Sequence, residues 1–372
     1  MKVLYDHQIF SFQKYGGISR YFHELVKNFR IVKGVKIELS LVFSNNYYIS
    51  ENNKGKYINF FPNKNFRYKN QIISYINKIK TIKKLKKQKF DIFHPTFNDP
   101  YFLEYIGDKP FVFTVHDMIN EKFPEMFPLD SATKNKKLLC EKASKIIAIS
   151  QNTKQDIMDI FNIDKSKIDV VYHGNSMHVN NDFKLNINLP DKYILYVGSR
   201  DRYKNFEKFI VAIAKILNEE KEASVICGGG GEFTSYELEL FYKLKIENRI
   251  IQFNVDDDVL AKLYSKATLF IFPSLYEGFG IPILEAFACK CPLACSNTSS
   301  LPEIAGDAAK YFDPYSEDSI YNVVKAVYKS DVVQESLIQK GLCRLEYFSW
   351  KRTIDETYKV YNSVSKLGIY EK

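Results

Sequence analysis

The sequence lacks any uninterrupted apolar run of about 18 residues, the length that a membrane-spanning helix needs, so we expect no such helix. Residues 1–7 turn polar before the apolar core of a signal peptide could form, and we therefore expect no export. Cysteine is scarce, because six cysteines among 372 residues do not make a disulfide framework, and this favours a reducing compartment. These shortages predict a cytoplasmic protein.

Acidic residues are missing between Glu51 and Asp91, although the whole chain has 44 of them. The basic residues of this stretch are Lys54, Lys56, Lys64, Arg67, Lys69, Lys78, Lys80, Lys83, Lys84, Lys86, Lys87 and Lys89. They outnumber the net charge of +9, so the remainder of the chain is close to neutral. A local basic face suggests an anionic partner such as lipid headgroups, a diphosphate-linked acceptor or nucleic acid. A solvated helix explains the stretch equally well.

Apolar residues recur at helical spacing within this basic stretch, at Ile72, Ile76, Ile79, Ile82 and Leu85. The spacing predicts a helix that packs through this stripe and turns its lysines to solvent. We therefore hypothesise that residues 54–89 contact an anionic membrane surface, which would hold the protein at the inner face of a membrane.

The order of the predicted elements indicates an α/β fold with two cores. Short β-type runs alternate twice with helix-length amphipathic segments, which predicts parallel sheets with helical crossovers. The first set of strands is expected at 2–5, 35–43, 91–94, 111–115, 145–149 and 168–172. The second set is expected at 193–197, 223–227, 250–252, 268–272 and 292–295, with helices starting near Lys204, Thr234, Asp257 and Pro282.

An Asn-rich stretch between Asn180 and Pro190 has no periodicity and is typical of a connection between domains. The predicted domains are residues 1–183, with a C-terminal helix from 350 to 372 packing back on them, and residues 184–349. Both are expected to be doubly wound and Rossmann-like, facing a central cleft. Such sheets bind ligands at the carboxyl ends of their strands, so residues just after strands are the candidates for a site.

Residues 272–286 carry the most informative motif, an apolar strand followed by Gly278-Phe279-Gly280 and a helix expected to have Pro282 at its first position. The free backbone amides of a helix start, approached through glycine, can hold an anion such as phosphate. Glu277 and Glu285 flank these amides and could accept hydrogen bonds from sugar hydroxyls. Alternatively, they are a loop charge and an ordinary first-turn acid.

Over this stretch the sequence resembles the retaining glycosyltransferases of family 4, which have a GT-B fold and a signature of two glutamates separated by seven residues. The resemblance extends over nearly the whole chain, from residues 15–20 to residues 311–314. It implies that Glu277 holds a hydroxyl of the donor sugar and Glu285 the ribose hydroxyls. The backbone amides that would serve the sugar and the diphosphate are those of Gly278, Phe279 and Gly280.

A basic loop follows the first strand of the second domain and contains Arg200 and Lys204. Transfer from a nucleoside diphosphate sugar develops negative charge on the leaving group, which a metal or fixed cations must stabilise. The resemblance places the diphosphate-binding Arg and Lys of the family on these two residues. Many relatives carry Arg directly before the Lys, where this chain has Tyr203, so Arg202 is a candidate to share the role of Arg200.

The first domain offers His116 and Asp117 at a strand end, which resemble the His-Asp of the family whose His faces the donor sugar. Gly16 and Gly17 resemble the glycine loop that closes over the diphosphate, although a plain tight turn is the alternative. Further donor-site candidates by resemblance are Gly228 in the Gly-rich turn and the base-reading segment Phe253, Asn254 and Val255. Ser150, Ser299 and Ser300 match positions that line the cleft, and a helix cap also explains Ser150.

Two motifs contain residue types that bind metals, but neither has the pattern of a metal site. Asp256, Asp257 and Asp258 precede a helical run, where acidic residues favour the helix start. Cys289, Cys291 and Cys295 lack paired Cys-x2-Cys spacing and a second ligand cluster. We therefore expect no metal and no cofactor.

Together these features predict a metal-independent retaining glycosyltransferase. Its resemblance to mannosyl-type members favours GDP-mannose as donor, with a UDP-sugar as the alternative, and a saccharide or lipid-linked saccharide in surface-polysaccharide biosynthesis as acceptor. His116, Arg200, Lys204 and Glu277 are the expected catalytic residues. The alternatives are a hydrolase that uses Glu277 and Glu285 as an acid/base pair, a sugar-nucleotide isomerase, or a non-catalytic module that binds membrane or nucleic acid.

Overall fold

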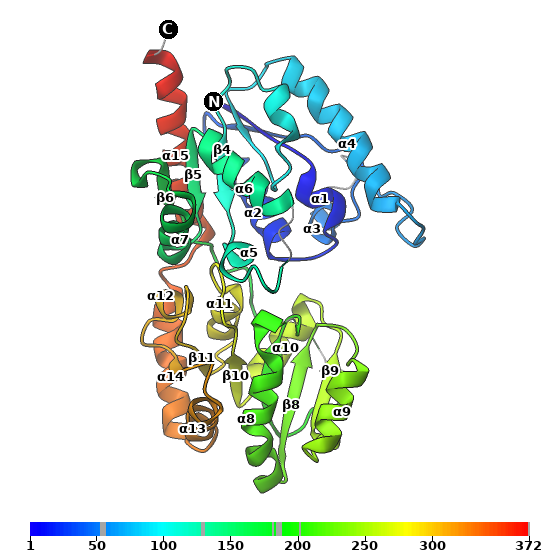
Figure 1. The fold of residues 1–372 in the computed structure, drawn as a ribbon, viewed down its shortest axis with the longest axis vertical. Coiled ribbons are helices and arrows are strands. Elements are labelled where there is room, and N and C mark those ends of the chain that lie inside the picture. The colour runs from blue at the N-terminus through cyan, green and yellow to red at the C-terminus, as the bar shows by residue number, and fades with distance from the viewer. Residues whose placement is uncertain (53–56, 128–130, 181, 184–187, 201, 371–372) are drawn as a thin grey trace. The chain divides into compact units, whose positions relative to one another are not determined.

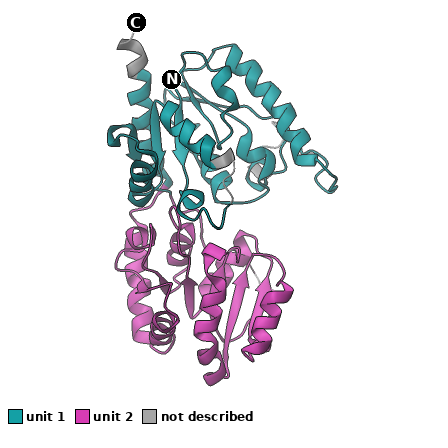
Figure 2. Cartoon of the chain, in the orientation of Figure 1, with its two compact units in different colours: residues 1–173, 350–372 teal, residues 174–349 magenta. Residues whose placement is uncertain are grey.

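The computed structural model describes residues 1–52, 57–127, 131–180, 182–183, 188–200 and 202–370. The chain forms two compact units, residues 1–173 with 350–372, and residues 174–349 (Figure 2). The first unit ends at His173, earlier than the boundary expected after residue 183, and includes the C-terminal helix. Lys54 and Lys56 of the basic stretch, and part of the expected connection, lie outside the described residues.

The first unit is built on two parallel three-stranded sheets. The strands β1 (Lys2–Tyr5), β2 (Lys36–Leu39) and β3 (Ile92–His94) pair in the order β2-β1-β3. The strands β4 (Val112–Val115), β5 (Lys145–Ala148) and β6 (Ile168–Val170) pair in the order β4-β5-β6. A parallel bridge between Phe93 and Phe111 joins the two sheets. All six strands lie within the ranges that the sequence predicts.

Eight helices of the first unit are described (Figure 1). They are α1 (Gln8–Phe12), α2 (Gly17–Phe29), α3 (Tyr47–Asn52), α4 (Lys69–Lys86), α5 (Ile119–Lys122), α6 (Ser131–Lys142), α7 (Gln151–Phe161) and α15 (Trp350–Tyr370). The last of these returns to the sheet because it buries Ile354, Val360 and Tyr361 in the core of this unit. The Tyr361 hydroxyl is 2.5 Å from the Tyr5 hydroxyl and 2.7 Å from His94 Nδ1, which ties the chain end to strands β1 and β3.

Helix α4 forms within the basic stretch, but of the predicted packing stripe only Leu85 is fully buried, and Ile76 and Ile82 are half-buried. The residues that the helix buries are Lys69, Ile73, Asn77, Thr81 and Leu85. The Asn77 amide accepts from the backbone N–H of Val42 at 2.8 Å and donates to the carbonyl of Phe43 at 2.8 Å. The backbone beside the helix needs hydrogen-bond partners, so polar residues occupy the inner side. Ile72 and Ile79 consequently remain 39% and 37% exposed.

The second unit has a six-stranded parallel sheet in the order β12-β11-β10-β7-β8-β9. Its strands are β7 (Lys192–Val197), β8 (Ala223–Gly228), β9 (Ile250–Phe253), β10 (Leu269–Phe272), β11 (Leu293–Ser296) and β12 (Lys310–Phe312). The sequence predicted the first five; β12 was missed because three residues are too few to show a strand pattern. The order reverses beside β7, so the carboxyl ends of β7 and β10 form a switch point where ligands bind in this class of fold.

The helices of this unit cover both faces of its sheet (Figure 1). They are α8 (Phe206–Glu219), α9 (Ser235–Lys243), α10 (Asp257–Lys266), α11 (Ile281–Ala288), α12 (Leu301–Ala305), α13 (Glu317–Tyr328) and α14 (Asp331–Leu345). Apolar residues of α8 and α13 share one core with the strands, and α11 packs beside α10 and α14. No helix among the described residues combines the length and the apolar character needed to cross a bilayer.

Candidate functional site

The loop after β10 carries the Gly-Phe-Gly motif and is held by serine hydroxyls that follow β11. The backbone N–H of Glu277 donates to Ser299 Oγ at 3.0 Å. Ser300 Oγ is 2.8 Å from the carbonyl oxygen of Glu277 and 2.9 Å from that of Phe279. Both serines were expected to line the cleft, and the structure assigns them the support of this loop. The protein's own side chains therefore fix the conformation of the motif.

Gly280 allows the loop to turn into helix α11. Its φ is +100°, and a Cβ at this position would lie 3.1 Å from side-chain atoms of both Ile283 and Leu301. A side chain would therefore meet both conformational strain and packed neighbours. The helix begins at Ile281, which places Pro282 at its second position, where a missing N–H costs no helical hydrogen bond. The N–H of Ile283 donates to the carbonyl of Gly280 at 3.0 Å, and the anion cradle expected at this helix start stays a prediction.

Lys204 and Glu277 lie together at the switch point. The Lys204 Nζ is 2.6 Å from Glu277 Oε1, and their side chains are only 17% and 14% exposed. The two loops that carry them are also joined through the backbone, because Leu275 N donates to Tyr203 O at 2.8 Å. A cation and a carboxylate at one point offer contacts for both a phosphate and a sugar hydroxyl. Their roles as ligands of a donor stay a prediction.

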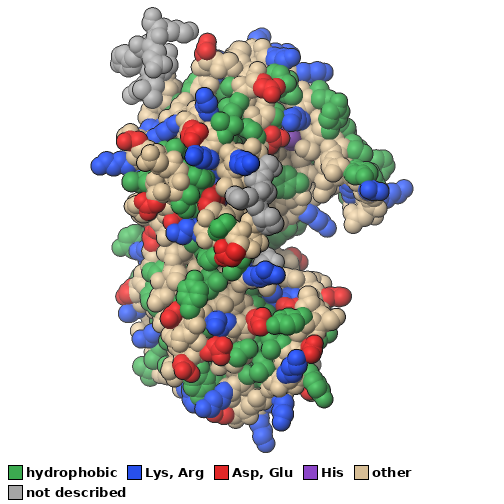
Figure 3. Space-filling model, in the orientation of Figure 1, with side chains coloured by type: hydrophobic (Ala, Val, Ile, Leu, Met, Phe, Trp, Pro, Cys, Tyr) green, Lys and Arg blue, Asp and Glu red, His purple; other side chains and the backbone are tan. Residues whose placement is uncertain are grey.

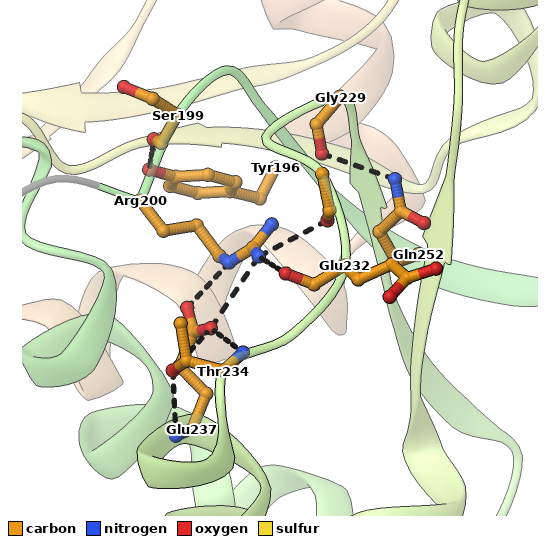
Figure 4. Close-up of polar contacts among 9 residues, drawn as sticks. Tyr196, Ser199, Arg200, Gly229, Glu232, Thr234, Glu237 and Gln252 are labelled. Atoms are coloured by element: carbon orange, nitrogen blue, oxygen red, sulfur yellow. Dashed lines mark hydrogen bonds and ion pairs between the residues drawn. The ribbon is translucent and has the colours of Figure 1, made fainter.

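Arg200 is directed toward helix α9 rather than left open (Figure 4). Its Nε donates to Glu237 Oε1 at 2.5 Å, and one terminal NH2 donates to the carbonyl of Glu232 at 2.7 Å. The guanidinium carbon also lies 4.8 Å from the ring centroid of Phe233. Arg200 therefore fastens the Gly-rich turn to α9. The other terminal nitrogen is buried without a hydrogen-bond partner among the described residues, so binding of a diphosphate by Arg200 remains a prediction.

Glu237 is the counter-charge of Arg200 and belongs to a capping box with Thr234 at the start of α9. Partial burial acts to raise the pKa of Glu237, but the hydrogen bonds from Arg200 and Thr234 outweigh it and hold the pKa below its usual value. The pair is therefore ionised at neutral pH. A hollow of about 770 Å³ beside it is bordered by Arg200, Arg202 and Lys208. The two arginines thus share one hollow.

The Gly-rich turn and the expected base-reading segment lie side by side. The backbone N–H of Gly229 donates to Phe253 O at 2.9 Å, and a Cβ at Gly228 would be 3.6 Å from a methyl of Val255. Gln252 Nε2 is 3.5 Å from Gly229 O and 3.3 Å from the side chain of Asn254. Figure 4 shows the Gln252 contact with Gly229. The structure thus brings together segments that are more than 20 residues apart in the sequence.

Glu285 lies in helix α11 and is largely buried, with 7% of its surface exposed. Its Oε2 accepts from the Tyr264 hydroxyl at 3.3 Å. Burial raises the pKa of Tyr264 well above its usual value, and the carboxylate of Glu285 raises it further, so this phenol stays protonated as a donor. The contact orients Glu285. Its predicted contact with a ribose is untested.

In the first unit, His116 follows strand β4 and is half-buried against aromatic rings. Tyr21 packs edge-on against it at 5.2 Å between ring centroids, and His173 lies parallel to it at 6.2 Å. Burial lowers the pKa of His116 to about 3, so the imidazole is neutral at physiological pH. Its Nε2 has no hydrogen-bond partner among the described residues. A neutral imidazole can exchange hydrogen bonds with a hydroxyl but does not supply a positive charge.

His173 is a residue that the sequence analysis missed. It follows β6 closely, as His116 follows β4, and Tyr21 lies edge-on to both rings. Burial lowers the pKa of His173 well below its usual value, with a smaller effect from His116. The sequence did contain a signal for His173, because it is a second histidine just beyond a predicted strand end.

The segment around His116 is anchored by a buried lysine. Lys136 Nζ is 2.8 Å from Glu121 Oε2 and 3.0 Å from the carbonyl of Asp117. The side chains of Lys136 and Glu121 are 8% and 2% exposed, so the charges compensate each other in a dry environment. This ion pair joins α5 and α6 beneath the residue that follows His116.

The glycine motif near the N-terminus forms the start of helix α2. Gly16 is the N-cap, and its carbonyl accepts from the N–H of Arg20 at 3.0 Å. The Gln13 side chain accepts from the N–H of Ser19 at 3.0 Å, which satisfies one amide of the first turn. Gly17 is the first helical residue. A helix start explains this geometry, and the predicted contact of Gly16 and Gly17 with a diphosphate is untested.

One of the two motifs with metal-binding residue types has a structural role. Asp256 caps α10 by accepting from the N–H of Val259 at 2.9 Å, which confirms the predicted capping. Ser150 caps α7 in the same way, with a distance of 3.0 Å to the N–H of Thr153. The cysteines Cys289, Cys291 and Cys295 are buried and free. Within the described ranges, no three His, Cys, Asp or Glu side chains are grouped as metal ligands.

Two protein-family models together match most of the sequence. "Glycosyltransferase Family 4" matches residues 15–176, and "Glycosyl transferases group 1" matches residues 179–342. The O-antigen chain mannosyltransferase B of Escherichia coli is 29% identical over 298 residues, which are 74% of this chain and 75% of the relative. An uncharacterized glycosyltransferase of Methanocaldococcus jannaschii is 29% identical over 276 residues, 70% of each chain.

A more distant relative in sequence is the N-acetylgalactosamine-N,N'-diacetylbacillosaminyl-diphospho-undecaprenol 4-alpha-N-acetylgalactosaminyltransferase of Campylobacter jejuni. It is 26% identical over 215 residues, which are 57% of this chain and 58% of the relative.

Solved structures resemble the fold over its full length. The sucrose-phosphate synthase of Thermosynechococcus elongatus has a TM-score of 0.77 over 98% of both chains at 18% identity. Anabaena HepE, solved with UDP and glucose, has a TM-score of 0.73 over 97% of this chain and 99% of its own, at 15% identity. At these identities the likeness concerns the fold alone, which is GT-B with two Rossmann-like units. The chain therefore belongs to the glycosyltransferases of family 4, also described as glycosyl transferases group 1.

Proposed function

We propose that this glycosyltransferase moves mannose from GDP-mannose to a saccharide or lipid-linked saccharide in surface-polysaccharide biosynthesis, with retention of configuration and without a metal. Among its relatives are proteins named O-antigen chain mannosyltransferases, which supports mannose as the sugar. The observation that carries the proposal is the ion pair between Lys204 and Glu277, in loops that follow the neighbouring strands β7 and β10. One site then offers a cation and a carboxylate.

In the proposed reaction, Lys204 donates to the diphosphate and stabilises the charge that grows as the glycosidic bond breaks. Lys204 exchanges its bond with Glu277 for a bond with phosphate, and Glu277 then accepts from a hydroxyl of the sugar. The amides of Gly278, Phe279 and Gly280 donate to the sugar and the diphosphate. Arg200 gives up its bond with Glu237 and donates to the diphosphate as a second cation. Alternatively, Arg202 provides this second cation.

His116 stays neutral in this scheme and contacts the donor sugar through its imidazole. A pKa of about 3 makes it a poor base at neutral pH, so we assign it the positioning of a hydroxyl and not proton transfer. The acceptor attacks from the face that the diphosphate leaves, and the leaving phosphate takes the acceptor proton. This front-face step is the retaining mechanism implied by the family resemblance.

A UDP-sugar is the second candidate donor. Anabaena HepE, a neighbour in fold, was solved with UDP and with UDP-glucose. The segment from Phe253 to Val255, proposed to read the base, would do so mainly through backbone groups, which its residue types do not encode. Binding experiments with GDP and UDP therefore decide which nucleotide the donor carries.

The test is a transfer assay with GDP-mannose and UDP-glucose as donors, lipid-linked saccharides extracted from bacterial membranes as acceptors, and either EDTA or magnesium. We expect mannose transfer in EDTA, with an α-linked product from the α-linked donor. Loss of transfer in EDTA would contradict metal independence. Release of free sugar without acceptor would favour the hydrolase, and no turnover with any donor would favour a binding module.

A further inference from the structure

The outward side of helix α4 is apolar over three turns. Tyr68, at the N-cap, is followed at helical spacing by Ile72, Tyr75 and Ile79, which puts all four on one side of the helix. The exposed fractions are 53%, 39%, 66% and 37%. The buried residues Asn77 and Thr81 lie on the opposite side of the helix. Two residues of the stripe that the sequence assigned to a core, Ile72 and Ile79, therefore face solvent.

Aromatic residues of the preceding loop extend this stripe. Phe61 is 53% exposed and Phe66 is 42% exposed, and their ring centroids are 6.1 Å apart. We call Phe61, Phe66, Tyr68, Ile72, Tyr75 and Ile79 the outer patch. Figure 3 shows hydrophobic side chains gathered over helix α4, at the upper right of the view, with Lys and Arg side chains beside them. Clustered exposed apolar residues on a folded domain mark an interaction site.

Basic residues flank the outer patch, and their charges are not neutralised. Lys64 and Arg67 lie at its loop end, and Lys83 and Lys86 continue the same side of the helix toward its C-terminus. Among the described residues, none of these four forms an ion pair with a carboxylate.

Lysines on other sides of α4 have partners within the fold. Lys84 is 2.8 Å from Glu38 Oε1 and Lys78 is 3.4 Å from Asp99 Oδ2, so carboxylates pair with both. Lys80 donates to the carbonyl of Leu41 at 2.8 Å, which leaves its charge in place. Within the described part of the chain, the basic residues beside the outer patch have no such carboxylate partner.

We propose that the outer patch docks on an anionic lipid bilayer. The isoleucines and aromatic rings enter the boundary between headgroups and acyl chains, and the flanking lysines and arginine contact lipid phosphates. Exposed isoleucines gain from an apolar phase, which the acyl chains of a bilayer provide and the bases, sugars and phosphates of a nucleic acid do not. The absence of acidic residues from positions 52–90 of the sequence fits an anionic surface. This docking is independent of the transfer reaction.

The experiment is co-sedimentation of the full chain with vesicles of phosphatidylcholine alone or with 30% phosphatidylglycerol, at about 0.1 M salt. We expect binding to the anionic vesicles that weakens with salt. A Lys83→Gln/Lys86→Gln variant should bind about 25-fold more weakly, since each neutralised lysine near the surface accounts for about fivefold. An Ile72→Ser/Ile79→Ser variant should also lose at least tenfold, roughly the effect of removing two apolar anchors from the boundary.

The matched control is Lys215→Gln/Lys243→Gln, which removes the same charge from exposed lysines of the second unit. It should bind anionic vesicles within twofold of the parent, and thermal unfolding should confirm that every variant is folded. Equal loss in this control would overturn the proposal, because net charge would then explain the binding. Full binding by the isoleucine variant would exclude insertion of the patch. Binding of duplex DNA but not of vesicles would identify the patch as a nucleic-acid surface instead.

Discussion

Replacement of Lys204 by alanine tests the donor site most sharply, because a single atom, the Lys204 Nζ, both pairs with Glu277 and is proposed to bind the diphosphate. Its Nζ lies 2.6 Å from Glu277 Oε1 in a pair that is mostly buried. In the proposed complex this nitrogen donates to the diphosphate, and a hydrogen bond between charged groups contributes about 1.5–3 kcal/mol. The affinity for the nucleoside diphosphate should therefore fall about 10- to 150-fold.

The assay is isothermal titration of the parent and the variant with GDP and with UDP. Lys215→Ala, which removes a lysine that is 66% exposed on α8, is the control and should leave the dissociation constant unchanged. Without Lys204, the carboxylate of Glu277 remains near the diphosphate and repels it. A Lys204→Ala/Glu277→Gln variant should therefore recover part of the lost affinity. A dissociation constant within twofold of the parent, in a folded Lys204→Ala variant, would refute the assignment of Lys204 to the diphosphate.

Three further predictions follow from strain, buried charge and buried histidines. Gly280→Ala should lower the free energy of unfolding by about 1–3 kcal/mol in denaturant titrations, because its φ of +100° and its packed neighbours both oppose a Cβ; an unchanged midpoint would contradict this. Lys136→Met should cost about 3–5 kcal/mol by leaving a buried carboxylate unpaired, whereas the exposed Lys137→Met should cost under about 0.5 kcal/mol in the same titration. Burial lowers the pKa of His94 and His116 to about 3 and that of His173 well below its usual value, while the unfolded chain binds protons on all three below about pH 6.5. Each of them lowers the free energy of unfolding by about 1.2 kcal/mol between pH 7 and pH 5.5, which makes about 4 kcal/mol for the three; equal stability at the two pH values would argue against neutral imidazoles.

Local patterns in the sequence predicted most of the fold. Alternating apolar runs located eleven of the twelve described strands, and the acidic run at residues 256–258 predicted the capped start of α10, where Asp256 is the cap. Strand ends also located the site, because Lys204 and Glu277 each follow a strand and the strands β7 and β10 are neighbours. Parallel strands bring their carboxyl ends to one edge, so position along the chain sufficed to place the two residues together.

What the sequence did not predict depends on partners that are distant along the chain. Arg200 donates both to the carboxylate of Glu237 and to the carbonyl of Glu232, and no local pattern indicates either acceptor. The inner side of α4 is polar because Asn77 satisfies backbone groups of Val42 and Phe43. Apolar periodicity identified the stripe of this helix but could not say which side faces the core.

The most direct test of the central claim is thermal unfolding with GDP, UDP, ADP or CDP, each in EDTA and in magnesium. A nucleotide at about 100 times its dissociation constant adds roughly 2.7 kcal/mol of stability. For a domain of this size, that corresponds to a rise of roughly 5–10 °C. We predict this rise with GDP in EDTA, and a smaller one or none with the other nucleotides. A rise with UDP alone would replace the proposed donor, and no rise with any nucleoside diphosphate would contradict the donor site itself.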